Sequence, residues 1–222
     1  MEEKSINIFE HHYFFQRRYM SHSQAKEGLA ARRKHRLGLR PSLSVDHNCS
    51  KILPHLYLGG HEMTTEADTL KTLNITHILS ITVDSYNHFP TQFSYQQFSL
   101  LDSAEADIVS IFEPAFAFIE SARAQGAACL VHCSFGMSRS PSVVLGYLMY
   151  SEKMSLAQAM IHVKGQRPVT APNHGFMHQL VVYEEQLCGT RSVDVEKYRA
   201  NRCASPSEFI INNVDKNKTS FK

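Results

Sequence analysis

The chain has 222 residues, of which 43% are hydrophobic, and a formal net charge of +2. This is enough for one domain of ordinary size with extensions. The chain has no run of eighteen apolar residues, which argues against a membrane-spanning helix and a membrane partner. We expect a soluble, intracellular protein, cytoplasmic or nuclear.

Charge divides the chain into three parts. Residues 1–48 carry nine Lys or Arg against five Asp or Glu, residues 49–190 seven against twelve, and residues 191–222 seven against four. Short apolar runs concentrate in the middle part, which we predict to be the folded domain. Residues 1–48 should form a basic flexible arm, and residues 191–222 a polar tail.

The first half of the predicted domain contains four short strands and two helices. Strands are indicated by "KILPHLYLGG" (51–60, two pieces), "THILSITV" (76–83) and "FSYQQFSL" (93–100). Between the first two stretches, residues 64–74 read as a short helix capped by Thr64 or Thr65. Apolar residues at helical spacing then predict a helix over 107–126, with Gly126 ending it.

The second half begins with "AACLVHC" (127–133), a fully apolar strand. Residues 140–153 are apolar nearly all round, as in a buried central helix. Ser155 should start a further helix, and Pro172 and Asn173 the last one. Helices that alternate with strands predict an α/β fold around a largely parallel sheet.

The cysteines occur at irregular spacing, which favours reduced thiols over a disulfide framework. No two of them form a CxxC pair, and the thirteen histidines are scattered, so we predict no metal site. The cysteines are Cys49, Cys129, Cys133, Cys188 and Cys203.

The stretch "VHCSFGMSRSPS" (131–142) links the apolar strand to the central helix. In a strand–loop–helix unit of this kind, backbone N–H groups and the helix dipole converge on one point and favour an anion. Gly136 permits a close approach of the backbone. Ser140 and Pro141 fit a helix N-cap followed by proline at the first helical position.

Two side chains give this loop its chemistry. A thiol at Cys133 would ionise readily beside an anion-binding site and act as a nucleophile. Arg139 offers a planar fork for two phosphate oxygens. Phosphoryl transfer depends mostly on positioning and charge stabilisation, so these groups need only a proton donor in addition.

The segment "HCSFGMSRS" resembles the HCxxGxSRS signature of atypical dual-specificity protein phosphatases, which are cysteine-dependent enzymes. The resemblance extends to "LLDSAEADIVSIFEPAFAFIESA", "SPSVVLGYLMY" and "GQRPVTAPNHGFMHQLVVYEEQL", and covers roughly residues 50–188. It implies a central, mostly parallel five-stranded sheet flanked by helices, with residues 49–190 as the catalytic domain. It further implies hydrolysis of phosphotyrosine and phosphoserine or phosphothreonine in phosphoproteins, without a metal or organic cofactor.

The resemblance also implies a role for each site residue. Cys133 would form a phosphocysteine, Arg139 would bind phosphate, and Asp102 would be the general acid and then the general base. Ser140 would hydrogen-bond the cysteine sulfur, and His132 would orient the loop from behind. The phosphate-binding loop would comprise Ser134, Phe135, Gly136, Met137, Ser138 and Arg139.

Several assignments have alternatives. Asp107 is a rival to Asp102, although its place before an apolar helix favours a cap. Asn173 could tie the last helix to the signature loop or simply cap that helix. His132 could be an ordinary core histidine. Phe135 stands where this family often has a small residue, which leaves its effect on the pocket open.

The overall function has alternatives too. A phosphopeptide-binding scaffold and a phosphatase of glycan or lipid esters remain candidates, whereas the arms lack the aromatic interleaving expected for nucleic-acid binding. The basic cluster and apolar pair in "RRKHRLGLR", from Arg32 to Leu39, are similar to docking motifs for MAP kinases. A solvated tail is the alternative that we favour, and a nuclear localisation signal is another.

Overall fold

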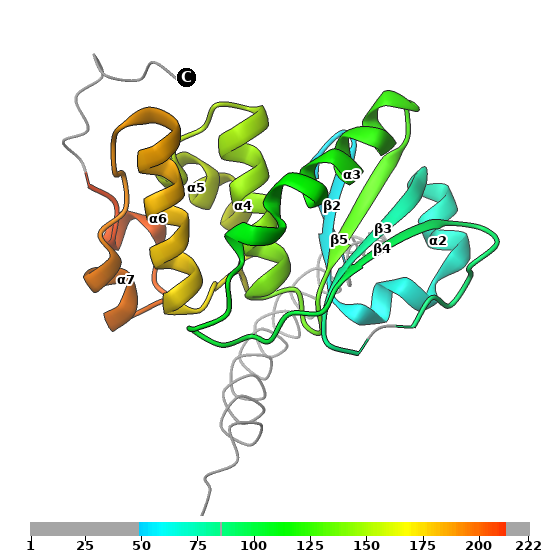
Figure 1. Cartoon of the computed structure of the whole chain (residues 1–222), viewed down its shortest axis with the longest axis horizontal. Coiled ribbons are helices and arrows are strands. Elements are labelled where there is room, and N and C mark those ends of the chain that lie inside the picture. The colour runs from blue at the N-terminus through cyan, green and yellow to red at the C-terminus, as the bar shows by residue number, and fades with distance from the viewer. Residues whose placement is uncertain (1–48, 85, 212–222) are drawn as a thin grey trace, which may run out of the picture. The chain divides into compact units, whose positions relative to one another are not determined.

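The computed structural model describes residues 49–84 and 86–211. Within this part, five strands form a sheet in the order β1-β2-β5-β3-β4 (Figure 1). β1 is antiparallel to β2, and the other neighbours are parallel. This arrangement confirms the predicted α/β fold with a mostly parallel five-stranded sheet. The strands are β1 (Cys49–Leu53), β2 (Leu56–Gly59), β3 (Ile75–Ile81), β4 (Ser94–Phe98) and β5 (Ala128–His132).

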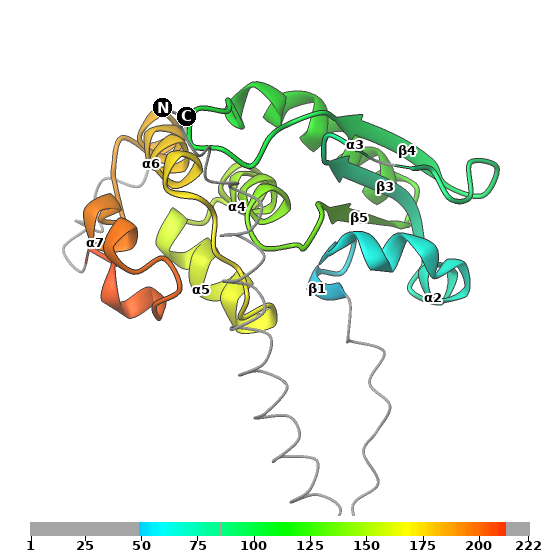
Figure 2. The same ribbon diagram turned by 90° about the horizontal axis from the view of Figure 1, so that it is seen from below.

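Helices cover both faces of the sheet (Figure 2). Helices α3 to α6 share a hydrophobic core with one face, and α2 packs against the other. The α-helices are α2 (Ala67–Thr72), α3 (Phe112–Ala124), α4 (Arg139–Ser151), α5 (Leu156–Gln166), α6 (His174–Cys188) and α7 (Val195–Ala200). Three 3-10 helices accompany them: η1 (His61–Thr65), η2 (Val109–Ile111) and η3 (Pro206–Glu208).

The sheet order brings three loops together. β5 lies between β2 and β3, and β4 lies beyond β3, so the loops that follow β3, β4 and β5 start from the same edge. In open α/β sheets, ligands bind at the carboxyl ends of the parallel strands. The loop between β5 and α4, residues 133–138, is here called the signature loop. It follows β5, and Asp102 follows β4, so both lie at this edge.

The predicted starts of α5 and α6 are confirmed. Ser155 forms a capping box with Gln158 at the start of α5. The side chain of Asn173 accepts a hydrogen bond from the N–H of Phe176 at the start of α6. The predicted cap of α2 was wrong, because Thr64 and Thr65 lie within η1, and Glu66 precedes α2 without a side-chain cap.

The start of α4 also differs from the prediction. The helix begins at Arg139, and Ser138 is its N-cap residue. Ser140 is therefore the second helical residue. Its hydroxyl does not cap the helix but donates a hydrogen bond to Sγ of Cys133. Pro141 is the third residue, where a missing N–H costs little because the first-turn N–H groups have no partner within a helix.

Packed structure continues beyond residue 190, where we placed the end of the domain. Residues 191–211 contain α7 and η3, and the fully buried side chains of Tyr198 and Phe209 belong to the main core. The Tyr198 hydroxyl donates to the carbonyl of Pro172 at 2.7 Å. The predicted N-terminal arm, residues 1–48, and the end of the predicted tail, residues 212–222, lie outside the described residues.

Glu184 of α6 fastens the start of this C-terminal segment. Its carboxylate accepts hydrogen bonds from the N–H of Leu156 at 2.8 Å and from the N–H and hydroxyl of Ser192 at 2.9 and 2.6 Å. Burial raises the pKa of Glu184. Glu184 thus joins Ser192 to α6, and α6 to the first turn of α5, by buried polar contacts.

Candidate active site

The signature loop joins β5 to α4 and turns sharply at Gly136. Its φ is +66°, in the left-handed region that glycine adopts without strain. A Cβ added here would lie 2.4 Å from the carbonyl oxygen of Gly59 on β2. Both the backbone conformation and the close approach of β2 therefore require glycine at this position.

The carbonyl groups of the loop bind partners outside it. The guanidinium of Arg167 donates to the oxygens of Phe135 and Gly136 at 3.0 and 2.8 Å. The N–H groups of His61 and Ala171 donate to the oxygens of the residues before and after this pair, at 3.2 and 2.7 Å. In a trans peptide the N–H points away from the preceding carbonyl. The N–H groups of residues 135–138 are therefore turned away from these partners, toward the inside of the loop.

Arg167 is the residue of this site that the sequence analysis missed. It lies within "GQRPVTAPN", a segment that carries the family resemblance, but no spacing rule connects it with a loop thirty residues earlier. Burial lowers the pKa of Arg167, and the nearby Cys133 raises it. Its fork-shaped group suits two adjacent carbonyl oxygens better than an ammonium would.

Cys133 lies at the bottom of the loop with two hydrogen-bond donors on its sulfur. Both the Ser140 hydroxyl and the Gly136 N–H are 3.2 Å from Sγ. Burial raises the pKa of this thiol, but the charge of Arg139 and the hydrogen bonds from Ser140 and the loop backbone outweigh burial, and the pKa is lowered. Such a thiol forms a thiolate more readily than a free cysteine.

Arg139 is held from both ends of its guanidinium group. Nη1 donates to the Leu100 carbonyl at 3.2 Å, and Nη2 donates to the Ser134 hydroxyl at 3.0 Å. Nε lies 4.0 Å from Asp102 Oδ2. These contacts fix the plane of the fork beside Cys133, where a bidentate cation can receive two phosphate oxygens.

Asp102 is fixed against the signature loop. Its Oδ1 accepts hydrogen bonds from the Ser138 hydroxyl at 2.6 Å and from Asn173 Nδ2 at 2.9 Å. Asn173 also donates to the Ser103 carbonyl and, through its backbone N–H, to the Ser138 hydroxyl. Asn173 therefore both caps α6 and ties the Asp102 loop to the signature loop, so the two alternatives from the sequence hold together.

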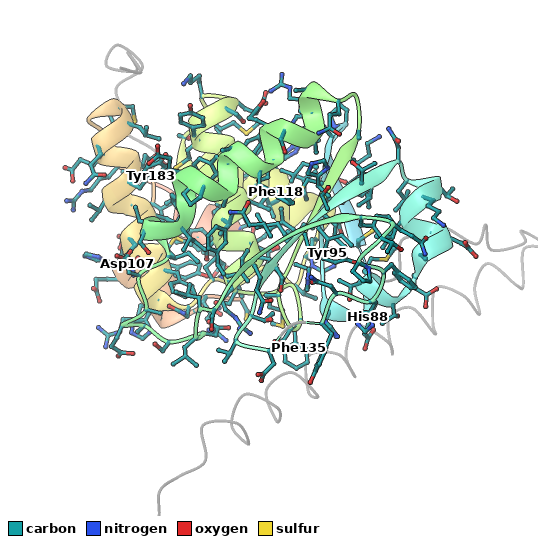
Figure 3. The ribbon with its side chains drawn as sticks, turned by 45° about the vertical axis from the view of Figure 1, so that its right-hand side comes forward. His88, Tyr95, Asp107, Phe118, Phe135 and Tyr183 are labelled. Atoms are coloured by element: carbon teal, nitrogen blue, oxygen red, sulfur yellow. The ribbon has the colours of Figure 1, made fainter. Side chains whose placement is uncertain are left out.

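Asp107 lies elsewhere. Its Oδ1 accepts a hydrogen bond from the N–H of Ser110 in η2 at 3.0 Å, whereas the N-cap position of α3 is Ile111, which has no side-chain cap. It lines a surface groove of about 420 Å³ along α6, together with Tyr183, and Cys133 is not part of that groove. Figure 3 shows Asp107 near Tyr183 and well away from Phe135 of the signature loop.

His132 and the two apolar loop residues occupy different environments. His132 is buried, its Nδ1 has no hydrogen-bond partner among the described residues, and burial lowers its pKa to about 4. The ring is therefore neutral at physiological pH. Its centroid lies 5.9 Å from the centroid of the His61 ring. Met137 is buried, whereas Phe135 is exposed at the surface (Figure 3).

Two classes of feature are absent from the described part of the chain. Residues 49–84 and 86–211 contain no cluster of three or more His, Cys, Asp or Glu side chains suited to a metal ion. No helix in these residues is long and apolar enough to cross a membrane.

The chain is similar to known protein phosphatases. Residues 56–186 match the family model for the dual specificity phosphatase catalytic domain. Protein phosphatase Slingshot homolog 3 of Mus musculus is 38% identical over 172 residues, which cover 78% of this chain and 26% of that protein. Dual specificity protein phosphatase 19 of Mus musculus is 37% identical over 147 residues, which cover 66% of this chain and 67% of that protein.

Solved structures give the same result for the fold. The crystal structure of human DUSP28 superposes with a TM-score of 0.61 at 32% identity, covering 64% of this chain and 96% of that one. A human tyrosine phosphatase-like serine/threonine/tyrosine-interacting protein superposes with a TM-score of 0.60 at 30% identity, covering 63% and 97%. This chain spans about a quarter of the length of the Slingshot relatives. On its sequence match and its fold, the chain belongs to the dual-specificity phosphatase family.

Proposed function

We propose that this chain is a protein phosphatase that hydrolyses phosphotyrosine and phosphoserine or phosphothreonine through a phosphocysteine on Cys133. The observation that carries the proposal is the environment of the Cys133 sulfur. It accepts hydrogen bonds from Ser140 and Gly136, in a loop whose N–H groups turn inward. The names of the relatives support the same reaction class.

In the first step, the Cys133 thiolate attacks phosphorus while the bond to the leaving oxygen breaks. Arg139 and the N–H groups of residues 134–139 bind the phosphoryl oxygens. The leaving oxygen takes a proton from Asp102. Oδ1 of Asp102 accepts two hydrogen bonds and Oδ2 lies 4.0 Å from Arg139 Nε, contacts that hold the carboxyl group beside Arg139.

In the second step, water hydrolyses the phosphocysteine. The Asp102 carboxylate takes a proton from water, the water oxygen attacks phosphorus, and the sulfur–phosphorus bond breaks. The electron pair returns to sulfur, where the hydrogen bond from Ser140 stabilises the departing thiolate. Asp102 ends protonated and ready for the next cycle, and no step needs a metal or organic cofactor.

A scaffold that binds phosphopeptides without turnover is the second candidate. It is favoured by the likeness to the tyrosine phosphatase-like interacting protein, whose name describes an interaction rather than a reaction. A phosphatase acting on glycan or lipid esters is a third candidate. It would use Cys133 as the nucleophile in the same way, and Arg139 as the group that binds phosphate, here called the phosphate clamp.

The deciding experiment measures hydrolysis of an aryl phosphate, a phosphopeptide panel, phosphorylated glycans and phosphoinositides in the presence of a metal chelator. Wild type should release phosphate from the phosphopeptides, and Cys133→Ser should not. Turnover that survives Cys133→Ser would rule out the phosphocysteine. Tight phosphopeptide binding without turnover by wild type would establish the scaffold.

The basic segment from Arg32 to Leu39 lies outside the described residues, and MAP kinase docking there is a separate part of the proposal. Cytoplasmic or nuclear location is likewise proposed. Deleting residues 1–48 and measuring kinase binding and cellular distribution tests both. No change in either would leave a solvated tail as the interpretation.

A further inference from the structure

Exposed apolar side chains concentrate at the sheet edge that holds the candidate site. Seven large hydrophobic side chains are exposed in the described part of the chain, and four of them lie in the loops that follow β3, β4 and β5. Isolated exposed apolar residues are common, but a group in neighbouring loops indicates a binding surface. The four are Val83, Tyr86, Leu101 and Phe135.

Two of the four side chains belong to residues that directly follow the two binding partners of Arg139. Arg139 donates to the carbonyl of Leu100 on one side and to the hydroxyl of Ser134 on the other. Leu101 and Phe135 are the next residues along the chain from these two partners. Their exposed fractions are 63% and 47%, against 2% for Cys133. Two exposed apolar side chains, here called the rim, thus follow the residues that hold Arg139, whereas the candidate nucleophile is buried.

The backbone fixes where both side chains stand. The Phe135 carbonyl accepts a hydrogen bond from the half-buried Arg167. Leu101 lies between Leu100, bound to Arg139, and Asp102, bound to Ser138. A rim that is already ordered loses little conformational entropy when a ligand packs against it.

We propose that Leu101 and Phe135 make this site selective for aryl phosphates, and for phosphotyrosine over phosphoserine and phosphothreonine. The inference rests on the proposed function. In phosphotyrosine an aromatic ring separates the phosphate from the backbone, so a phosphate at Cys133 places the ring at the height of the rim. The ring of Phe135 can then contact it in an offset or edge-to-face geometry.

Phosphoserine and phosphothreonine present a different group to the same rim. Their phosphate is attached at Cβ, so the peptide backbone itself must come close to Leu101 and Phe135. Backbone N–H and C=O groups would lose water there without gaining hydrogen-bond partners from the two apolar side chains. The rim thus favours one substrate class and opposes the other.

The test compares two peptides that differ only in phosphotyrosine or phosphothreonine at one position. Wild type should show a higher kcat/KM for the phosphotyrosine peptide. Phe135→Ala should lower that value about fivefold, within the range of a lost aromatic contact, while the phosphothreonine value stays equal or rises. Leu101→Ala should shift the ratio in the same direction, and Phe135→Tyr should keep it.

Ile161→Ala is the matched control, because Ile161 is an exposed apolar side chain on α5, away from this edge. It should leave the ratio unchanged. If Phe135→Ala does not fold, Leu101→Ala decides the outcome. An equal ratio in wild type, Phe135→Ala and Leu101→Ala would overturn the inference alone, whereas hydrolysis of neither peptide by wild type would overturn the proposed function as well.

Discussion

The hydroxyl of Ser140 lies 3.2 Å from the sulfur of Cys133 and donates a hydrogen bond to it. Ser140 is in the first turn of α4, and Cys133 follows the last residue of β5, so the bond spans the whole signature loop. One contact thus links the buried central helix to the candidate nucleophile, and it favours the thiolate over the thiol.

Ser140→Ala should reduce turnover and shift thiol reactivity to higher pH. The pKa of Cys133 is lowered in the folded protein, and alkylation requires the thiolate, so the alkylation rate should level off at a lower pH than for a free cysteine. Without the hydrogen bond from Ser140, the pH profile of the alkylation rate should shift to higher pH. A hydrogen bond to a charged group contributes about 1.5–3 kcal/mol, so turnover should fall roughly ten- to hundredfold. Iodoacetamide rates against pH measure the shift, and an unchanged profile would contradict it.

Asp102→Asn should slow hydrolysis of an alkyl phosphate, which has a poor leaving group, by about a hundredfold or more. Asp107→Asn is the control, because the Asp107 side chain accepts a hydrogen bond from the exposed Ser110 N–H and asparagine can accept the same bond. Its effect should be limited to stability and stay below the cost of about 0.5–2 kcal/mol for losing such a bond altogether. Steady-state rates and urea unfolding of both variants separate the roles. A full-rate Asp102→Asn enzyme would remove Asp102 as the acid.

Arg167→Ala should weaken oxyanion binding although Arg167 has no place in the phosphate clamp itself. Two loop carbonyls would lose their donor, and the N–H groups opposite them would lose their fixed orientation. We expect tungstate affinity to fall roughly tenfold, with Arg167→Lys intermediate because an ammonium lacks the fork. Calorimetric titration measures both. Arg191→Ala, which breaks an exposed pair with Glu185, should bind tungstate like wild type.

Glu184→Gln should destabilise the fold by about 1–3 kcal/mol, because an amide cannot accept all three hydrogen bonds that the carboxylate accepts. It should also change the pH dependence. The folded pKa of Glu184 is raised, so the folded state binds this proton more tightly than the unfolded chain. The stability that Glu184 contributes through this proton is fully present below its pKa in the unfolded chain and is lost as the pH rises through its pKa in the folded state. Denaturant midpoints measured from pH 4 to 8 should therefore show this pH dependence in wild type and not in Glu184→Gln. Identical pH dependence in the two proteins would contradict the assignment.

A chain ending at residue 190 should unfold, whereas one ending at residue 211 should fold. The shorter chain lacks Tyr198 and Phe209, which are fully buried in the main core. Removing one buried aromatic side chain costs about 3–5 kcal/mol, against a typical total stability of about 5–15 kcal/mol. Thermal unfolding of both truncations measures the difference. If the shorter chain unfolds cooperatively with the same midpoint temperature as the longer one, the folded domain ends at residue 190 after all.

The sequence alone determined the strands, most of the helices and the candidate catalytic groups. Apolar runs with β-branched residues marked the strands, and helical spacing marked α3, because burial imposes those periods on any sequence. The spacing of Cys133 and Arg139 also sufficed to predict one loop, since both lie between the same strand and helix. Local pattern carries this information because each feature depends on residues close together in the chain.

Only the tertiary structure decided which distant residues serve that loop. Arg167 donates to the loop carbonyls from the end of α5, and Asn173 joins Asp102 to Ser138 from the start of α6. Tyr198 and Phe209 complete the core from a stretch whose composition is mostly polar. These contacts join residues that are far apart in the chain and that meet only when the helices pack at the carboxyl ends of the parallel strands. The hydrophobic periodicity of a local segment does not predict which distant residues it will contact.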